Sequence, residues 1–177
     1  MKKFYRWLPT TKNKQPGSTI VELLVVIAVL AILTSLTIPG LAFLKQNSIG
    51  LELDKLQIVC QLLQKKAVST GQKEYLSFNP NEHSYFYLNH FEKLADGLFF
   101  GVIPGVKGPP ANPKDTITNP ITFPGQKITF YPNGTISAGT AYLTNAQNKL
   151  YAITVPVSQV SFIRKYQYIH GIWIYLK

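Results

Sequence analysis

Glu22 is the residue whose place in the sequence most demands a chemical explanation. It stands at the start of an apolar run, and no polar side chain follows it from Leu23 to Leu33. Within hydrocarbon an unpaired ionisable group costs at least about 2.5 kcal/mol, so charged residues there usually have a partner. We therefore expect Glu22 to have a partner.

The histidines, the serines and the single cysteine lack the spacing of a catalytic or metal site. His83 and His90 are seven residues apart, His170 lies far along the chain, and no His-Glu-x-x-His pattern is present. No serine has the glycine frame of a nucleophile elbow, and no glycine-rich phosphate loop follows a strand. Cys60 has no second cysteine to pair with, so we expect it to be buried. The sequence therefore predicts surface histidines, no metal site, no cofactor and no enzyme activity.

Basic residues make nucleic acid a hypothesis to weigh. Lys and Arg outnumber Asp and Glu by 18 to 8, but residues 1–17 hold five of the cations and no acid. The excess of +10 thus falls to +5 without them, which weakens an argument from charge alone. The segment 164–170 mixes cations with tyrosines, a composition that can grip phosphates and stack bases. The candidate contacts are Arg164, Lys165 and Lys177, and the alternative is an ordinary solvated strand.

The apolar run that follows Glu22 predicts a helix long enough to cross a membrane. Residues 23–44 span about 30 Å at 1.5 Å per residue, close to the thickness of a hydrocarbon core. Pro39 and Gly40 predict a kink late in this helix. A cleaved secretory signal would need small residues at a cleavage site, which this run lacks. An ordinary membrane anchor explains the length and the basic leader, but leaves Glu22 unexplained.

Helical periodicity continues beyond the apolar run, over residues 45–71. Its apolar positions are expected to pack under a sheet, while a second set takes the other face. Gly71 is the predicted C-terminal stop. The apolar set is Leu56, Val59, Leu63 and Ala67, with Ile58 and Leu62 beside them, and the polar set is Glu52, Lys55, Gln61, Gln64 and Lys65.

Residues 72–177 read as a domain with an antiparallel β-sheet. Turn residues 79–82 separate two aromatic-rich segments, and 132–135 follow another, as in hairpins. Residues 97–125 are so rich in proline and glycine that they predict a long surface loop. The predicted strands are 75–78, 85–88, 127–131, 150–155, 159–163 and 171–175. A long helix followed by hairpins gives the α+β class.

The segment Gly17 to Leu33 resembles the class III signal of type IV pilins and type II secretion pseudopilins. The resemblance implies that residues 1–17 are a leader, which a prepilin peptidase removes after Gly17 and before N-methylating Ser18. It also implies that Glu22 meets the α-amino group of the neighbouring subunit when a new subunit joins the fibre. Residues 18–44 would then be the transmembrane and assembly helix.

The second half of the chain resembles the GspH/FimT family of minor pseudopilins and minor pilins. The block Ile128–Ile136, followed by Ala138–Leu143, looks like the F-x-P-x-G-T block of that family. The strand Tyr151–Val155 corresponds to the one before its closing Gly-Arg element. The chain departs from the family at Ser158–Arg164, which lacks the Gly-Arg pair.

Together the two resemblances imply a pilin-like fold and a minor pseudopilin of a type II secretion system. The expected partners are the prepilin peptidase, other pseudopilins or pilins in a fibre, and the bacterial inner membrane. The expected location is a single pass through that membrane with the C-terminal domain in the periplasm. One alternative is a minor type IV pilin that binds DNA during natural transformation. Another is a membrane-anchored adaptor that never polymerises and keeps its leader.

Overall fold

The computed structural model describes residues 20–46 and 48–176. The chain divides into two compact units, residues 1–44 and residues 45–177. Helix α1 (Ile20–Gln46) accounts for the described part of the first unit, and helix α2 (Ser48–Thr70) opens the second. All of the buried apolar side chains in the described residues belong to the second unit, so that unit holds the hydrophobic core.

Helix α2 owes its position to a stripe of apolar side chains that recur every three or four residues. This spacing puts them on one face of the helix, where they are fully buried. The stripe comprises Ile49, Leu53, Leu56, Cys60, Leu63 and Ala67, with Val59 beside it. The helix ends before Gly71, whose positive φ of 69° and N–H bond of 3.1 Å to the Ala67 carbonyl form the expected C-terminal stop. The predicted apolar face is confirmed, except that Ile58 and Leu62 are exposed.

Strands follow α2 for the rest of the second unit, and every pairing between them is antiparallel. In chain order they are β1 (Glu74–Asn79), β2 (Ser84–Tyr87), β3 (His90–Lys93), β4 (Leu98–Phe100), β5 (Lys107–Gly108), β6 (Asp115–Thr116), β7 (Lys127–Phe130), β8 (Gly139–Asn145), β9 (Leu150–Val155), β10 (Arg164–Ile169) and β11 (Ile172–Leu176). A short 3₁₀ turn, η1 (Pro124–Gln126), precedes β7. The α+β class with antiparallel pairing is therefore confirmed.

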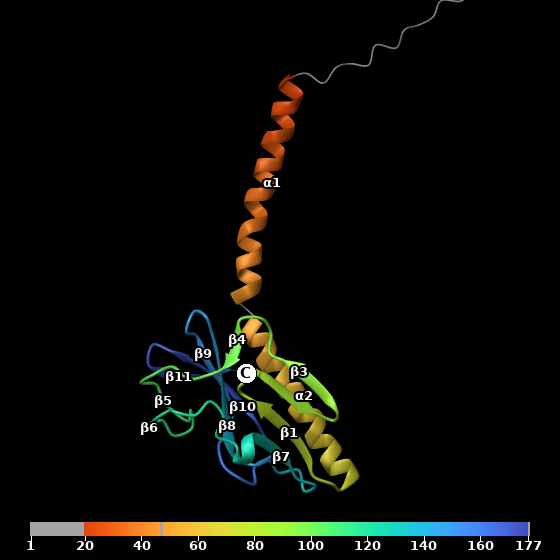
Figure 1. Ribbon diagram of the computed structural model, residues 1–177, viewed down its shortest axis with the longest axis vertical. Helices are drawn as coiled ribbons and strands as arrows, with labels where there is room; N and C mark the ends of the chain where they lie inside the picture. The colour runs from red at the N-terminus through yellow and green to blue at the C-terminus, as the bar shows by residue number, and fades with distance from the viewer. Residues whose placement is uncertain (1–19, 47, 177) are drawn as a thin grey trace, which may run out of the picture. The chain divides into compact units, whose positions relative to one another are not determined.

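Within residues 48–176 these strands form two main sheets instead of the single sheet that the sequence predicted. Sheet I has the order β3-β2-β1-β7 and sheet II the order β11-β10-β9-β8-β4, while β5 and β6 form a small ribbon. Helix α2 packs against β1 and β7 of sheet I and against β8 of sheet II (Figure 1). One apolar stripe of α2 thus covers the inner faces of both sheets. Hairpin patterns show which strands are neighbours along the chain, but they do not show that the strands divide into two sheets.

The proline- and glycine-rich segment 97–125 is more ordered than the predicted surface loop. It contains β4, the β5–β6 ribbon and the start of η1, and β4 pairs with β8 at the edge of sheet II. Ile117, Ile121 and Phe123 are buried. Ile117 and Val106 join Tyr142, Leu150 and Ala152 in a second apolar cluster on the outer face of sheet II. Strands β8 and β9 are consequently buried on both faces.

One predicted hairpin is confirmed and one predicted strand is wrong. Beside the 132–135 turn, β7 does not pair with β8, and Phe130 makes a single bridge to Ile136. Strand β1 pairs with β2 across the 79–82 turn, in which the Asn79 side chain accepts hydrogen bonds from the N–H groups of Asn81 and Glu82. Residues 159–163 do not form a strand. Gln159 has a positive φ of 72°, which interrupts extended backbone, and Val160 makes a single bridge to Ile136.

Candidate functional site

Helix α1 exposes apolar side chains on every side. Ile20 is 80% exposed, and the large apolar side chains from Val21 to Leu33 are also exposed. Glu22 is exposed in the first described turn, among these apolar neighbours. The hydroxyl of Thr34 donates to the carbonyls of Leu30 and Ala31 at 3.0 Å, so the helix itself satisfies this polar group.

Several predicted features of the N-terminal segment lie outside the described residues. Gly17 and Ser18 are among them, and so are the side chains of residues 35–46. Helix α1 continues through Pro39 and Gly40. The bend predicted at these two residues stays a prediction. Among the helical residues that the structure describes, no helix combines the length and hydropathy needed for a membrane crossing.

One turn of α2 ties the helix to both sheets through polar contacts, and we call Glu52, Asp54 and Lys55 the α2 clamp. Glu52 is buried and accepts a 3.3 Å hydrogen bond from the hydroxyl of Tyr85 on β2. Asp54 pairs with Lys165 on β10 at 2.5 Å, and Lys55 pairs with Glu92 on β3 at 2.8 Å. The clamp therefore fixes both sheets relative to α2.

The surroundings of the clamp shift two pKa values. Burial, followed by the nearby Glu52 carboxylate, raises the pKa of Tyr85 well above its usual range, so this hydroxyl stays a donor. The hydrogen bond to Glu92 raises the pKa of Lys55, against a smaller lowering by burial. The sequence pattern predicts Glu52 on the solvent face of the helix, and this prediction is wrong. Glu52 lies three residues after Ile49 and four residues before Leu56, a spacing that puts it beside the buried stripe. This spacing is the signal in the sequence that could have indicated its burial.

Lys165 is not available as a nucleic-acid contact in this structure, which corrects the sequence-based candidate set. It is only 8% exposed, and its ammonium group is held by Asp54. Arg164, next to it on β10, is exposed, with its guanidinium 4.8 Å from the centre of the Phe162 ring. Lys177 lies outside the described residues. Successive residues of a strand face opposite sides of the sheet, so Arg164 and Lys165 point in opposite directions. Of these two candidate nucleic-acid contacts, Arg164 alone is exposed.

The histidines and the cysteine do not assemble into a reactive group within the described part of the chain. His90 and His170 are exposed, but His83 is half-buried and packs near Phe99, which corrects the expectation of three surface histidines. Cys60 is fully buried as predicted, and burial raises the pKa of its thiol far above the usual range. No group of three or more potential metal ligands occurs among the residues described.

The F-x-P-x-G-T block forms a tight connection between β7 and β8 that α2 holds in place. Gly134 has a positive φ of 81° and donates to the carbonyl of Tyr131 at 2.9 Å. The side chain of Gln64 on α2 donates to the carbonyls of Gly134 at 2.7 Å and Ser161 at 3.0 Å. The glycine of the block is therefore required by backbone geometry.

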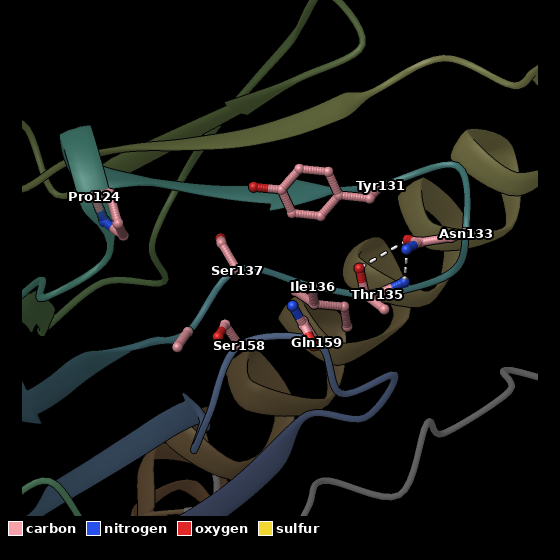
Figure 2. Close-up of a pocket in the computed structure, with 9 residues that line it drawn as sticks. Pro124, Tyr131, Asn133, Thr135, Ile136, Ser137, Ser158 and Gln159 are labelled. Atoms are coloured by element: carbon pink, nitrogen blue, oxygen red, sulfur yellow. Dashed lines mark hydrogen bonds between the residues drawn. The ribbon is translucent and has the colours of Figure 1, made fainter.

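A hollow of about 780 Å³ lies beside this connection, and Figure 2 shows the side chains that line it. Asn133 accepts hydrogen bonds from the backbone and hydroxyl of Thr135, and Ser137 accepts one from the Thr129 N–H. The lining residues are Pro124, Tyr131, Asn133, Thr135, Ile136, Ser137, Ala138, Ser158 and Gln159. They offer hydroxyl, amide and apolar groups, which suit hydrogen bonding to a neutral polar group, and lack a carboxylate or imidazole for acid–base chemistry.

Comparison with known proteins bears on the N-terminal segment. Residues 12–38 match the family model described as the prokaryotic N-terminal methylation motif. The matched residues include Gly17, Ser18 and Glu22, so the match supports an N-terminus like that of type IV pilins, which prepilin peptidase processes and which assemble into fibres. It does not distinguish pilins from pseudopilins. No curated protein and no solved structure matches the chain.

Proposed function

We propose that this chain is a minor pseudopilin of a type II secretion system, a fibre subunit that assembles into a periplasmic pseudopilus for protein export. The observation that carries the proposal is the methylation motif at residues 12–38, which overlaps a helix with exposed apolar side chains all round. A helix without a polar face needs burial in a membrane or among other helices. A lipid bilayer buries such a helix before assembly, and neighbouring helices bury it within a fibre.

In this proposal Glu22 acts as a register device. The prepilin peptidase cuts after Gly17, and the new α-amino group of Ser18 on one subunit meets the Glu22 carboxylate of the next. Pairing makes a carboxylate within hydrocarbon far less costly than an isolated one. The pair therefore favours one stagger between neighbouring helices over others.

The proposed location is the bacterial inner membrane, with a single pass through residues 18–44 and the second unit in the periplasm. Support comes from the apolar run and from the basic leader, which favours the cytoplasmic side. We propose a structural subunit and not an enzyme, because the methylation motif is typical of subunits that assemble into fibres.

One feature favours a GspH-type pseudopilin over a DNA-binding minor pilin. The F-x-P-x-G-T block, which forms the β7–β8 connection and is held by Gln64 of α2, is shared by both kinds of subunit and fits either. The salt bridge with Asp54 removes Lys165 from the DNA contacts that the alternative needs. Arg164 is the described residue that still supports the alternative.

Mass spectrometry of the N-terminus of the protein isolated from its own membrane tests the proposal. The expected product begins at an N-methylated Ser18. Gly17→Leu should leave residues 1–17 attached, whereas Pro16→Ala, one position earlier, should still be processed. A native polypeptide that begins at Met1 would overturn the proposal and favour the adaptor that never polymerises.

Glu22 separates processing from assembly. Glu22→Gln keeps the size of the side chain and removes its charge, so cleavage should continue while incorporation into isolated pseudopili is lost. Glu22→Asp keeps the charge and should retain part of the incorporation. Equal incorporation of wild type and Glu22→Gln would contradict the assigned role.

Deletion of the gene distinguishes the two kinds of fibre. Loss of protein secretion with intact DNA uptake is the expected result for a pseudopilin. Loss of DNA uptake with intact secretion, together with duplex binding that Arg164→Ala weakens, would favour the DNA-binding minor pilin.

A further inference from the structure

Strand β11 forms one edge of sheet II, and its turn fixes which of its backbone groups face outward. It follows β10 through the two-residue turn His170-Gly171, in which both residues have positive φ, 48° and 88°. Such a turn places the flanking residues Ile169 and Ile172 opposite each other as a hydrogen-bonded pair. From that pair onward, hydrogen-bonded and non-hydrogen-bonded pairs alternate along the two strands.

Along β11 the backbone groups of Ile172, Ile174 and Leu176 therefore bond to β10, while those of Trp173 and Tyr175 point away from it. Among the described residues, no hydrogen bond uses the outward N–H and C=O groups of these two aromatic residues. The free edge thus presents two donors and two acceptors on a strand that is paired along its length with β10.

The side chains of β11 lack the devices that usually protect an edge. The strand carries no charge and no proline, and Ile172, Ile174 and Tyr175 are 62%, 40% and 53% exposed. Strand β3, at one edge of sheet I, instead carries Glu92 and Lys93, and β4 at the other edge of sheet II is three residues long. Natural sheets use charges and short strands in this way to discourage edge pairing.

The geometry points to β11 as a docking edge for the β11 strand of a second copy of this chain. Antiparallel pairing about a two-fold axis at Ile174 places Trp173 opposite the partner's Tyr175. It also places Tyr175 opposite the partner's Trp173. Each of these pairs exchanges two hydrogen bonds, so four bonds use all of the outward groups. The two copies of sheet II would become one continuous sheet.

The composition of the strand favours this occupant over another chain. In the proposed register Ile174 meets its own counterpart on one face, and Trp173 lies beside the partner's Tyr175 on the other, so apolar pairs face each other throughout. A charged strand from another protein would find no counter-charge on the described part of β11. The proposal does not involve α1 or the methylation motif, so it stands apart from the proposed fibre function.

Disulfide trapping of the full chain in its own membrane tests the register. Ile174→Cys places two sulfurs across a non-hydrogen-bonded pair, at about 4.5 Å between Cα atoms, which a disulfide can bridge. Ile172→Cys is the matched control, because its two copies would lie roughly 13 Å apart, four residues along the strand. Ile172 is the more exposed of the two, so random collisions would cross-link it first. Native Cys60 is buried, and the unmodified chain gives its background.

We expect a linked dimer from Ile174→Cys and at least about tenfold less from Ile172→Cys. Equal linkage of the two variants, no linkage of either, or linkage of Ile174→Cys to a different protein would each overturn the proposal.

Tyr175 tests the outward hydrogen bonds. In the Ile174→Cys background, Tyr175→Pro removes the outward N–H without touching the ladder to β10, and two of the four bonds are lost. Trapping should fall about tenfold or more relative to Tyr175→Val, which keeps the N–H. Near-ultraviolet circular dichroism checks that the proline variant is folded, and unchanged trapping in a folded variant would contradict the proposal. If it does not fold, the comparison of Ile174→Cys with Ile172→Cys still decides.

Discussion

The two helices of this chain place their apolar side chains in opposite situations. In α1 the large apolar side chains from residue 20 to 33 are exposed on every side, whereas α2 buries a single stripe completely. Helix α2 also carries the clamp, whose contacts reach β2, β3 and β10. Helix α2 is therefore a structural part of its unit, while the apolar surface of α1 calls for a membrane or other helices.

This difference assigns separate tasks to the two units. The buried apolar side chains of the described chain all lie in residues 49–155, so folding of the second unit does not use those of α1. Substitutions in α2 should change stability, and substitutions in α1 should change localisation and assembly. Four experiments probe that division, from the largest expected effect to the smallest.

A leucine in each helix gives the sharpest contrast. Leu63→Ala empties a fully buried position and should lower the free energy of unfolding of the second unit by about 3 kcal/mol. Leu24→Ala removes the same atoms from an exposed position and should change that free energy by less than about 0.5 kcal/mol. Urea denaturation of the full chain in detergent, followed by tryptophan fluorescence, measures both. Equal losses would mean that α1 is part of the same folding unit.

The Asp54–Lys165 pair should have the next largest effect, because one of its partners is buried. Asp54→Ala leaves the ammonium of Lys165 enclosed without its counter-ion, and we expect a loss of about 2 kcal/mol, moderated by the partial exposure of Asp54. The double variant Asp54→Ala/Lys165→Met removes the buried charge as well and should recover part of the loss. Denaturation of the two variants gives the comparison. No recovery would argue against an electrostatic cause.

Alkaline pH should destabilise the second unit through its buried tyrosines. Burial raises the pKa of Tyr142 to about 12, so the folded state retains a proton that the unfolded state releases near its ordinary pKa of 10. This contribution to stability is complete below pH 10 and is lost as the pH rises from 10 to about 12. Thermal unfolding between pH 9 and 12 should show a smaller fall for Tyr142→Phe than for wild type. Helix α1 contains no tyrosine and adds nothing to this transition.

The smallest effect is expected at the outer contact of the clamp. Lys55 and Glu92 are both partly exposed, so Lys55→Met should cost about 0.5 kcal/mol, and added salt should shrink the difference. Denaturation at low and high salt measures it. If Lys55→Met lowered the free energy of unfolding as much as Asp54→Ala does, solvent exposure would not explain the relative strength of the two salt bridges.

The sequence could predict features that depend on neighbours along the chain. Leu56, Val59, Leu63 and Ala67 recur at helical spacing and are buried, Gly71 ends the helix, and residues 79–82 form a hairpin turn, so each of these was correctly predicted. The methylation motif is of the same kind, since its residues are adjacent in sequence and match a known family model. Such features depend on local backbone geometry and periodicity.

Only the tertiary structure decided features whose partners are distant in sequence. The sequence around Lys165 predicts a phosphate contact, but its ammonium group binds Asp54, more than a hundred residues away. Glu52 is buried because Tyr85 supplies a hydroxyl, and the strands divide into two sheets because one helix covers both. The free energy of burying a charge or an apolar face depends on which groups surround it in space. Composition and spacing along the chain do not specify those groups.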